Sequence, residues 1–529
     1  LRRNAFFSYL CTLFIRYMST NYTPNPNKDK NKLDSMDIEN ENNFPFFLKK
    51  IRLNPFRHIN DLTIEFRHPI SVISGINKSG KSTILMAIAC SHYEFKKRNP
   101  QNGNLDRYTW SALMQFTNRD LQDRDWTYYI TYKQGRKLLE NRRGQRKGDT
   151  RKWNGIAKKQ GQFKFRDVVF IDLDRVSPAR NFSKVIFNLT KRSNESPISQ
   201  QNTQKIEAYL SYIFEQKFSL NKLATYQDKD IFKYKDGSNQ YSSYNAAAGE
   251  EVLIKIIIDT VEAKEKSLIL IDEIEVGLHP KIQRKLIQVL YHIAINDHKQ
   301  FILTTHSQTI LASVPEKSRI FIERDYNDNF NSIPDISINV ALSKMDSEIY
   351  PLVELYCEDE TCCKIINKAI EDLRSKGHPD INNLISIMIS GDANKTYDYY
   401  TAHKETNKKR KLIKVKCACI LDGDMKKQQN FDHNDSNLHF LYSEENPEVF
   451  LVKAYHQKNP NDNLSYHIEN SDNHCLFGKL VELGVCQDTD KAFELCWDAF
   501  ISTNEGKQYL EELEEFLIKI TKEDVPSYL

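Results

Sequence analysis

The stretch that decides the fold of this chain is Gly75-Ile-Asn-Lys-Ser-Gly-Lys-Ser82, which fits the pattern G-x-x-x-x-G-K-[ST]. The apolar residues 70–73 before it predict a strand, and apolar residues at helical spacing from Ser82 onward predict a helix. A glycine-rich loop in this context turns backbone N–H groups toward phosphates, and the helix N-terminus adds partial positive charge. The stretch therefore predicts an α/β fold with a nucleotide-binding loop.

Each position of this loop has an expected task. Lys81 is predicted to reach the β- and γ-phosphates of ATP, and Ser82 to hold Mg²⁺. The other predicted contacts to the nucleotide are Gly75, Asn77, Lys78, Ser79, Gly80 and Thr83. The alternative, a chance turn rich in Gly, Lys and Ser, is disfavoured by the strand before the loop and the helix after it.

Two later strands are expected to bring further chemistry to the same place. Asp272 and Glu273 follow the apolar stretch 267–271, and His306 follows the strand predicted at 301–303. Ligands of open α/β sheets bind where parallel strands end. We assign Asp272 to Mg²⁺ and Glu273 to positioning and deprotonating the attacking water, with His306 as a γ-phosphate sensor. Alone, each signal is also compatible with a structural role; their order along the chain favours an ATPase.

These residues resemble the ATPase heads of the ABC superfamily, in particular the OLD and Septu (PtuA-like) branch of bacterial anti-phage ATPases. The resemblance covers roughly residues 46–325 and is carried by Leu48–Arg57, residues 75–83 and Ile271–Pro280. It implies an ABC/SMC-like head that forms homodimers, or a higher oligomer, with ATP sandwiched between subunits. It also implies a signature loop that completes each site from the partner subunit.

We place this signature loop at residues 246–251, where Gly249 matches the family. Ala248 replaces the serine that usually precedes this glycine. Losing a hydrogen bond to a charged group costs about 1.5–3 kcal/mol, which implies slow turnover.

The second half of the chain alternates strands and a helix again, which predicts a small doubly wound parallel sheet. Glu358 follows one predicted strand, and Asp422 and Asp424 follow another, so these acids are expected at one edge of the sheet. Such a set can hold Mg²⁺ and support attack on a phosphodiester.

This pattern resembles a TOPRIM domain, the metal-binding module of OLD nucleases, and the acidic stretch Glu444–Glu448 resembles a later motif of that domain. However, Asp359 and Cys362 stand where that family has a glycine and an acid. Two interpretations are therefore compatible with the sequence: a working nuclease site, or a domain that keeps the fold without the activity.

The predicted organisation follows changes in composition. Of the 529 residues, 40% are hydrophobic and 28% charged, as in a globular protein of several domains. The chain begins with Leu, and we expect the true start at Met18 or Met36. The predicted parts are a disordered or non-native leader (1–45), the ATPase domain (46–330) with a basic insertion (133–166), a TOPRIM-like domain (345–460) and a helical tail (470–529).

Cysteines and basic stretches bear on location and partners. The ten cysteines include no C-x-x-C pair, which predicts reduced thiols in a cytoplasmic protein, and the apolar stretch Ala5–Ile15 is too short to span a membrane. Residues 133–166 hold thirteen Lys or Arg against two acids, and 404–416 hold seven against one. These stretches are either a nucleic-acid interface or a solvated surface.

The resemblance implies an ATP-binding and hydrolysing subunit of a bacterial anti-phage defence system whose head controls a nuclease. That nuclease is expected to be an HNH-type partner, in a retron with a reverse transcriptase and its RNA–DNA product. The alternative is a self-sufficient OLD-type nuclease that uses Mg²⁺ at its own TOPRIM site. A DNA repair or chromosome-organising ATPase is disfavoured because the chain lacks the sustained heptads of coiled-coil arms.

Overall fold

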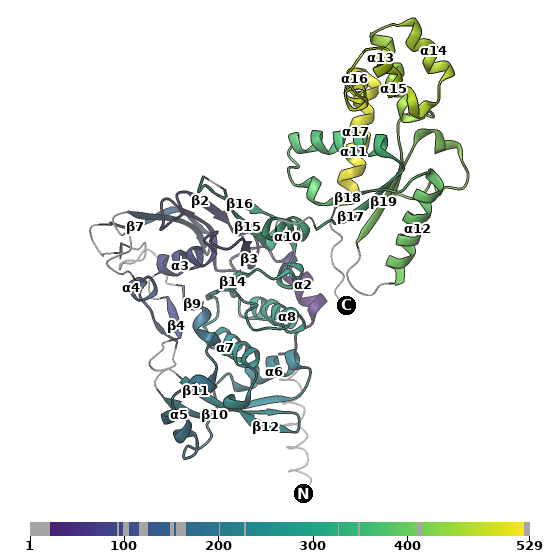
Figure 1. Ribbon diagram of the computed structural model, residues 1–529. Helices are drawn as coiled ribbons and strands as arrows, with labels where there is room; N and C mark the ends of the chain where they lie inside the picture. The colour runs from purple at the N-terminus through teal and green to yellow at the C-terminus, as the bar shows by residue number, and fades with distance from the viewer. Residues whose placement is uncertain are drawn as a thin grey trace. The chain divides into compact units, whose positions relative to one another are not determined.

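The chain divides into two compact units in a computed structural model (Figure 1). One unit is built from the chain up to Met345 and the other from Asp346–Asp524, so the boundary falls beside the start predicted for the second domain. The structure describes residues 22–92, 95–98, 105–115, 125–148, 153–154, 166–199, 201–226, 229–325, 327–346, 350–409 and 415–522.

An eight-stranded, mainly parallel sheet forms the centre of the first unit. Its order is β16 (Phe330–Pro334), β15 (Arg319–Arg324), β3 (Ile70–Gly75), β14 (Gln300–Thr304), β13 (Leu268–Ile271), β9 (Val168–Ile171), β4 (Lys96–Arg98) and β5 (Leu105–Arg107). The pairs from β15 through β4 are parallel, whereas the outermost strands β16 and β5 pair antiparallel. Apolar residues in β13 do not alternate with polar ones and all are fully buried, as in strands covered on both faces. The predicted α/β fold is confirmed.

Helices flank this sheet (Figure 1). The helix after the phosphate loop, α3, contacts β3, β13 and β14, and α6 packs on α7 and α8. The helices of this unit are α2 (Pro26–Ser35), α3 (Lys81–Ser91), α4 (Trp110–Leu113), α5 (Lys184–Thr190), α6 (Thr203–Phe214), α7 (Ala248–Glu262), α8 (Pro280–Asn296), α9 (Gln308–Ala312) and α10 (Ile338–Asp346).

Helix α2 corrects the prediction of a disordered leader over residues 1–45. Although its composition is polar, Leu33 is fully buried and α2 packs on α8. Asp29 Oδ2 lies 2.9 Å from His292 Nδ1, and Asp34 Oδ1 lies 3.0 Å from His68 Nε2. One buried leucine and two hydrogen-bonded contacts to histidines of the head therefore order this segment. Residues 1–21 lie outside the described part of the chain.

Two antiparallel sheets complete the first unit. One has the order β2 (Leu62–Glu65), β1 (Phe46–Leu53), β6 (Trp126–Gln134), β7 (Lys137–Arg146) and β8 (Trp153–Asn154). The other has the order β10 (Phe218–Tyr226), β11 (Lys229–Asp236) and β12 (Asn239–Ser242). Strand β1 thus includes the first part of the stretch Leu48–Arg57 that carries the family resemblance. The predicted basic insertion contributes β7, while residues 149–152 and 155–165 of it lie outside the described residues.

The second unit is built on a four-stranded parallel sheet. Its order is β18 (Ile385–Ile389), β17 (Val353–Cys357), β19 (Lys416–Leu421) and β20 (Leu438–Phe440). Its helices are α11 (Glu360–Ser375), α12 (Ala393–Lys409), α13 (Pro447–Lys458), α14 (Asp462–Asn470), α15 (Leu476–Glu482), α16 (Thr489–Ile501) and α17 (Asn504–Thr521). Leu355, Ile365, Phe450, Phe493 and Leu513 share one core, so the predicted helical tail packs with the sheet in a single unit.

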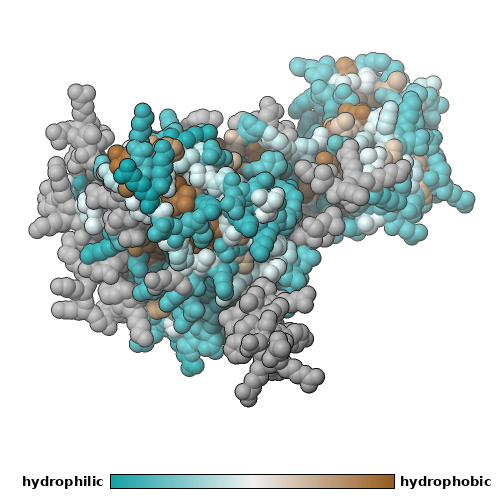
Figure 2. Space-filling view, turned by 90° about the horizontal axis from the view of Figure 1, so that it is seen from below, coloured by the Kyte–Doolittle hydropathy of each residue, from teal (hydrophilic) through white to brown (hydrophobic). Residues whose placement is uncertain are grey.

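The surface shown in Figure 2 is mostly hydrophilic, with small hydrophobic patches. Large exposed hydrophobic residues of the described chain include Val185, Tyr399 and Tyr466. Within the described ranges, every helix is too short or too polar to cross a membrane.

Candidate active site

Three neighbouring strands of the large sheet deliver the predicted ATPase residues to one edge. Strand β14 lies between β3 and β13 and pairs with both in parallel. Their carboxyl ends are level, because Leu303 is opposite both Ile271 of β13 and Val72 of β3. The phosphate loop leaves β3, Asp272 and Glu273 leave β13, and His306 leaves the strand between them. The topology therefore brings together groups that lie far apart in the sequence.

The phosphate loop has the backbone that its glycines permit. Gly75 has φ +152° and Gly80 has φ +91°, and a Cβ on Gly75 would lie 2.5 Å from the carbonyl oxygen of Ile322. Ser79 Oγ is buried and has no hydrogen-bond partner within the described residues. The tight backbone curve of the loop is the conformation in which a glycine-rich loop turns its N–H groups toward phosphates, which fits a bound nucleotide.

Lys81 is the cation inside this loop. Its Nζ donates hydrogen bonds of 2.9 Å to the carbonyl oxygens of Gly75 and Ile76. Burial lowers the pKa of Lys81 to about 8, although Glu273 and Asp272 oppose the shift. An ammonium that is poorly solvated and held only by carbonyl oxygens is well placed to exchange them for anionic phosphate oxygens.

The remaining predicted loop contacts differ in exposure. Asn77 and Lys78 are exposed at the loop's outer side, and Lys78 has φ +67°. Thr83 is buried at the start of α3. The side chains of Asn77 and Lys78 are therefore accessible, whereas that of Thr83 is not.

Ser82 and Asp272 form the predicted Mg²⁺ pair. Ser82 Oγ donates a hydrogen bond of 3.1 Å to Asp272 Oδ1, and Thr304 Oγ1 donates one of 2.6 Å to the same oxygen. A serine hydroxyl and a buried carboxylate are oxygen ligands of the kind that Mg²⁺ takes beside a nucleotide. The residues present fit the ion.

Glu273 is held in an unusual backbone conformation. Its φ is +45°, in the left-handed region that a side chain with a Cβ rarely adopts. The N–H of Glu273 donates to Thr304 Oγ1 at 2.7 Å, and Arg175 Nη2 donates to its carbonyl oxygen at 2.6 Å. Strain of this kind persists only where surrounding contacts enforce it and is common at active sites.

Electrostatics around Glu273 suit a proton acceptor. Burial raises its pKa, and the nearby carboxylates of Asp272 and Glu275 raise it further, while Lys81 and Arg175 oppose the shift. A carboxylate whose pKa is raised toward neutrality takes a proton more readily than an ordinary glutamate does.

His306 is fixed by a carboxylate that the sequence analysis left without a role. Glu275 Oε1 accepts a hydrogen bond of 2.6 Å from the His306 N–H, and Glu275 Oε2 accepts one of 2.7 Å from Thr305 Oγ1. Burial, and then Lys81, lower the pKa of the His306 imidazole. A neutral imidazole beside the loop can still donate one hydrogen bond to a phosphate oxygen.

Three residues with roles at this site were thus missed from sequence, namely Arg175, Glu275 and Thr304. Glu275 and Thr304 lie within stretches already singled out, so their position at strand ends was an available signal. No signal in the sequence pointed to Arg175, because its partner is the backbone carbonyl of Glu273, far along the chain.

Gly249, the predicted signature glycine, lies in the first turn of α7. A Cβ on Gly249 would lie 2.0 Å from the carbonyl oxygen of Gly277, so this position admits no side chain without a shift. Gly277 belongs to the loop that follows Glu273. The glycine is therefore required for packing inside its own head. This packing does not bear on its predicted role toward the ATP of a partner subunit.

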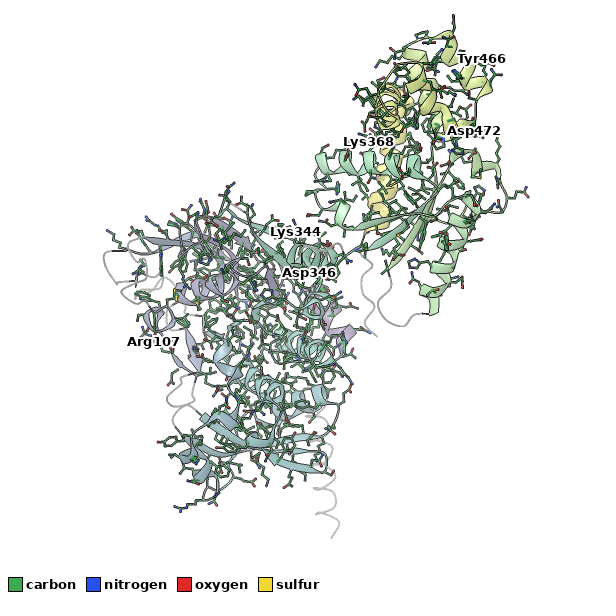
Figure 3. All side chains as sticks on the ribbon, in the orientation of Figure 1. Arg107, Lys344, Asp346, Lys368, Tyr466 and Asp472 are labelled. Carbon is green, nitrogen blue, oxygen red and sulfur yellow. The ribbon has the colours of Figure 1, made fainter. Side chains whose placement is uncertain are left out.

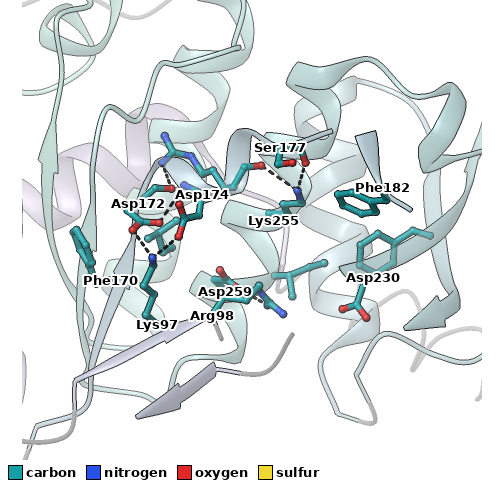
Figure 4. Close-up of a pocket in the computed structure, with 14 residues that line it drawn as sticks. Lys97, Arg98, Phe170, Asp172, Asp174, Ser177, Phe182, Asp230, Lys255 and Asp259 are labelled. Carbon is teal, nitrogen blue, oxygen red and sulfur yellow. Dashed lines mark hydrogen bonds and ion pairs between the residues drawn. The ribbon is translucent and has the colours of Figure 1, made fainter. Parts of the chain in front are cut away.

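A cavity of about 370 Å³ lies in the same unit but is not lined by the phosphate loop (Figure 4). Arg175 lines it, as do Lys97 with its partners Asp172 and Asp174, and Arg98 with its partner Asp259. Lys97 and Arg98 are thus paired with carboxylates, whereas Lys255 donates to the carbonyl oxygens of Arg175 and Ser177. Arg175 connects the cavity with the candidate site, since it lines the cavity and donates a hydrogen bond to the carbonyl oxygen of Glu273.

In the second unit, the predicted acids Glu358 and Asp422 meet at the edge of the small sheet. Glu358 Oε1 accepts a hydrogen bond of 2.6 Å from the Asp422 N–H. Burial, and then Glu358, raise the pKa of Asp422 to about 9, and burial raises that of Glu358 to about 7. Burial also raises the pKa of Asp424. Asp422 Oδ1 is buried without a hydrogen-bond partner among the described residues, so this acidic edge fits a cation.

Several basic side chains of the two stretches 133–166 and 404–416 are buried or paired within the protein. Lys133 is buried and donates to the carbonyl oxygens of Ile38 and Asn40. Arg146 is buried with its guanidinium 4.6 Å from the ring of Trp126. By contrast, Arg142 and Arg143 are exposed on β7. In the second stretch Lys404 pairs with Asp435, and residues 410–414 lie outside the described part of the chain.

Comparison with protein families agrees with the ATPase prediction. Residues 112–312 match the family described as "AAA domain, putative AbiEii toxin, Type IV TA system". The matched segment contains Asp272, Glu273 and His306 and begins after the phosphate loop.

One curated relative matches a shorter segment. Over 170 residues the chain is 31% identical to the "Retron Vc95 probable ATPase" of Vibrio cholerae serotype O1 biovar El Tor. The alignment covers 28% of this chain and 31% of that protein, so less than a third of the relative is spanned.

Two solved structures show a distant likeness. The SMC head domain from Thermotoga maritima matches with 16% identity and a TM-score of 0.32, over 54% of this chain and 98% of that one. An Smc head domain with an extended coiled coil from Pyrococcus furiosus matches with 12% identity and a TM-score of 0.34, over 56% and 98%.

Proposed function

We propose that this chain binds ATP with Mg²⁺ at the edge formed by β3, β14 and β13 and hydrolyses it. The observation that carries the proposal is the convergence of Lys81, Asp272, Glu273 and His306 beside a loop with an unsatisfied buried hydroxyl. The test is phosphate release from ATP by the purified chain in the presence of Mg²⁺ and in excess chelator. No release above the chelated control would overturn the proposal.

The residues divide the work of hydrolysis. When bound, Mg²⁺ supplies positive charge against the phosphates, and Ser82 and Asp272 hold it. Lys81 exchanges its two carbonyl partners for phosphate oxygens. Glu273 orients the attacking water and accepts its proton, while the neutral imidazole of His306 donates a hydrogen bond to the γ-phosphate.

We further propose that two heads pair in a homodimer, or in a higher oligomer, with ATP between them. Gly249, at the start of α7, would then face the partner's γ-phosphate. Ala248 cannot donate the hydroxyl hydrogen bond that a serine there would give, so turnover is expected to be slow. The test is a mass measurement in solution with and without ATP: dimers that form only with ATP support the proposal.

For the biological role, we propose the ATPase of a retron-associated antiviral defence system in the bacterial cytoplasm. The naming of the Vibrio cholerae relative as a retron ATPase supports this. The head would control a separate HNH-type nuclease, together with a reverse transcriptase and its RNA–DNA product. Co-purification from the native operon tests it: recovery of the chain with neither a nuclease nor a reverse transcriptase would contradict it.

A second candidate is intrinsic nuclease activity in the TOPRIM-like unit. The buried acids Glu358 and Asp422, which form no ion pair within the described residues, favour it over a purely structural unit. Plasmid cleavage by the purified chain with Mg²⁺ or Mn²⁺ tests this activity. An Asp422→Ala/Asp424→Ala variant that cleaves as well as the parent would exclude these residues as its source.

A further inference from the structure

A second group of metal-ligating side chains lies in the second unit, in addition to the predicted acids. Asp359, Glu448 and His474 place one carboxylate or imidazole atom each within 4.8 Å of one another. They come from the turn after β17, the first turn of α13 and the short helix η7 (Asn473–Cys475), which precedes α15. Asp359 and His474 lie outside the set that the sequence predicted for Mg²⁺.

Glu448 is the residue of this cluster with a buried oxygen that lacks a partner among the described residues. The residue is only 3% exposed, yet its Oε2 has no hydrogen-bond partner in the described part of the chain. Its other oxygen, Oε1, accepts a hydrogen bond of 2.6 Å from Thr361 Oγ1, which fixes the carboxylate with Oε2 facing the cluster. Leaving a buried charged oxygen unsatisfied is costly, so native proteins supply a partner.

His474 by itself does not supply that partner. Its Nδ1 lies 3.9 Å from Glu448 Oε2, which is too long for a hydrogen bond. An ion between the two atoms removes this difficulty, since both can bind it at about 2.0–2.2 Å. The side chain of His474 is 65% exposed, so its imidazole can rotate to bring a ring nitrogen to the ion.

Hydrogen bonds within the unit also hold the two other proposed ligands, Asp359 and His474. Asp359 Oδ1 accepts a hydrogen bond of 2.8 Å from the Cys362 N–H at the start of α11. The backbone of His474 is held by Asp472, whose Oδ1 accepts from the His474 N–H at 3.0 Å, and Asp472 is labelled in the helical part of this unit in Figure 3. Hydrogen bonds of this kind orient metal ligands before the ion arrives.

We propose that Asp359, Glu448 and His474 bind a Zn²⁺ ion. Two carboxylates and one imidazole are ligands that Zn²⁺ takes, whereas Mg²⁺ prefers oxygen ligands alone. Three protein ligands leave one position for water, next to the acidic edge at Asp422. The ion would also tie η7 and α13 to the end of β17. The proposal does not depend on ATP hydrolysis by the head.

The test uses the full chain, freed of nucleotide and treated with chelator, titrated with Zn²⁺ against a colorimetric chelator. We expect one Zn²⁺ per chain that millimolar Mg²⁺ does not displace, and a higher unfolding temperature of the second unit with Zn²⁺. Glu448→Gln and His474→Ala should each weaken Zn²⁺ binding at least about tenfold and abolish the temperature shift. His474→Ala alters an exposed side chain and so keeps the test valid if Glu448→Gln fails to fold.

Two variants serve as controls. His467→Ala removes a histidine outside the cluster, and Cys475→Ser removes the exposed thiol that is the competing Zn²⁺ ligand beside His474. Both should bind Zn²⁺ like the parent. Unchanged affinity in Glu448→Gln and His474→Ala, or loss of binding in Cys475→Ser alone, would overturn the proposal.

Discussion

Ser82 Oγ lies 3.1 Å from Asp272 Oδ1, although 190 residues separate them in the chain. One belongs to the helix that opens after β3 and the other follows β13, two strands away in the sheet. The contact exists because parallel strands end at a common edge, where ligands of α/β proteins bind. It fixes the point at which the proposed Mg²⁺ would bridge the head and the nucleotide.

Replacing the proposed base should separate hydrolysis from binding. We expect Glu273→Gln to lower the rate of phosphate release about 10²–10⁴-fold, because the amide cannot accept the proton from water. ATP binding should persist, and dimers should accumulate with ATP. The exposed Glu265 offers a matched control, since Glu265→Gln should hydrolyse ATP normally. An active Glu273→Gln enzyme would remove Glu273 from the mechanism.

Removing the loop cation should act on binding itself. Lys81→Ala deletes the charge-assisted contacts to the phosphates, worth about 1.5–3 kcal/mol, so ATP affinity should fall roughly 10- to 150-fold. Fluorescence titration with a labelled ATP analogue measures this. Lys264→Ala, at an exposed position in the same unit, should bind ATP like the parent. Equal affinity for the two variants would contradict the assignment.

The docking of helix α2 should contribute to the stability of the first unit. Leu33 is fully buried, so Leu33→Ala should lower the free energy of unfolding by about 2–5 kcal/mol. Urea denaturation measures the loss. Lys32→Ala, on the exposed face of the same helix, should change the free energy of unfolding little. If both variants unfold alike, α2 does not pack on the head in solution.

The second unit should lose stability as pH rises from 7 to 8.5 in the absence of divalent cations. Burial raises the pKa of Asp422 to about 9, far above its unfolded value near 4, so the folded unit holds a proton that the unfolded chain has released. The free energy of unfolding then falls with pH, by at most about 1.4 kcal/mol per pH unit for this group.

The same pH window contains an additive effect and avoids an opposing one. Burial raises the pKa of the Cys362 and Cys417 thiols to about 11, so these groups also lower the free energy of unfolding as pH approaches their unfolded value of about 8.5. Burial lowers the pKa of His439 to about 4, and that group favours folding as pH rises only below its unfolded value near 6.5. Urea denaturation across the window measures the slope. Asp422→Asn should make the slope shallower by up to about 1.4 kcal/mol per pH unit, whereas Asp432→Asn, at an exposed position, should leave it unchanged. An Asp422→Asn slope equal to that of the parent would assign the effect to other groups.

Strand β7 provides the test of nucleic-acid binding. Each arginine that contacts a phosphate contributes about 0.9 to the slope of log K against log salt concentration for duplex DNA. Arg142→Ala/Arg143→Ala should therefore weaken binding and lower the slope by up to about 2. Lys217→Ala/Lys235→Ala removes two exposed charges elsewhere in the unit as a control. Binding that is independent of salt, or equal loss in both variants, would count against this interface.

Local chemistry made the phosphate loop and the core strands predictable. Eight consecutive residues supply the whole loop, and the positive φ values of Gly75 and Gly80 are conformations that glycine adopts readily. Likewise, the unbroken apolar stretch that became β13 is short and rich in isoleucine, which favours a strand buried on both faces. The order of these elements then placed Asp272, Glu273 and His306 at one edge.

In the segment 1–45, amino-acid composition gave a wrong prediction for the part that forms α2. A polar segment without many apolar residues predicts disorder, because it has little hydrophobic surface to bury. In the structure, Leu33 finds a buried site on the head, and Asp29 and Asp34 find histidine partners. These partners lie far along the chain, so only the folded head decides whether α2 forms.

By itself, therefore, the sequence determined the nucleotide loop, the parallel strands and the acids and histidine at their ends. Only the tertiary structure decided which groups complete each site: Thr304, Glu275 and Arg175 around Glu273, and His474 beside Asp359 and Glu448. The physical reason is the range of the interactions. A loop or a buried strand is specified by neighbours in sequence, whereas a hydrogen bond or a shared ion depends on atoms that the chain brings together only by folding.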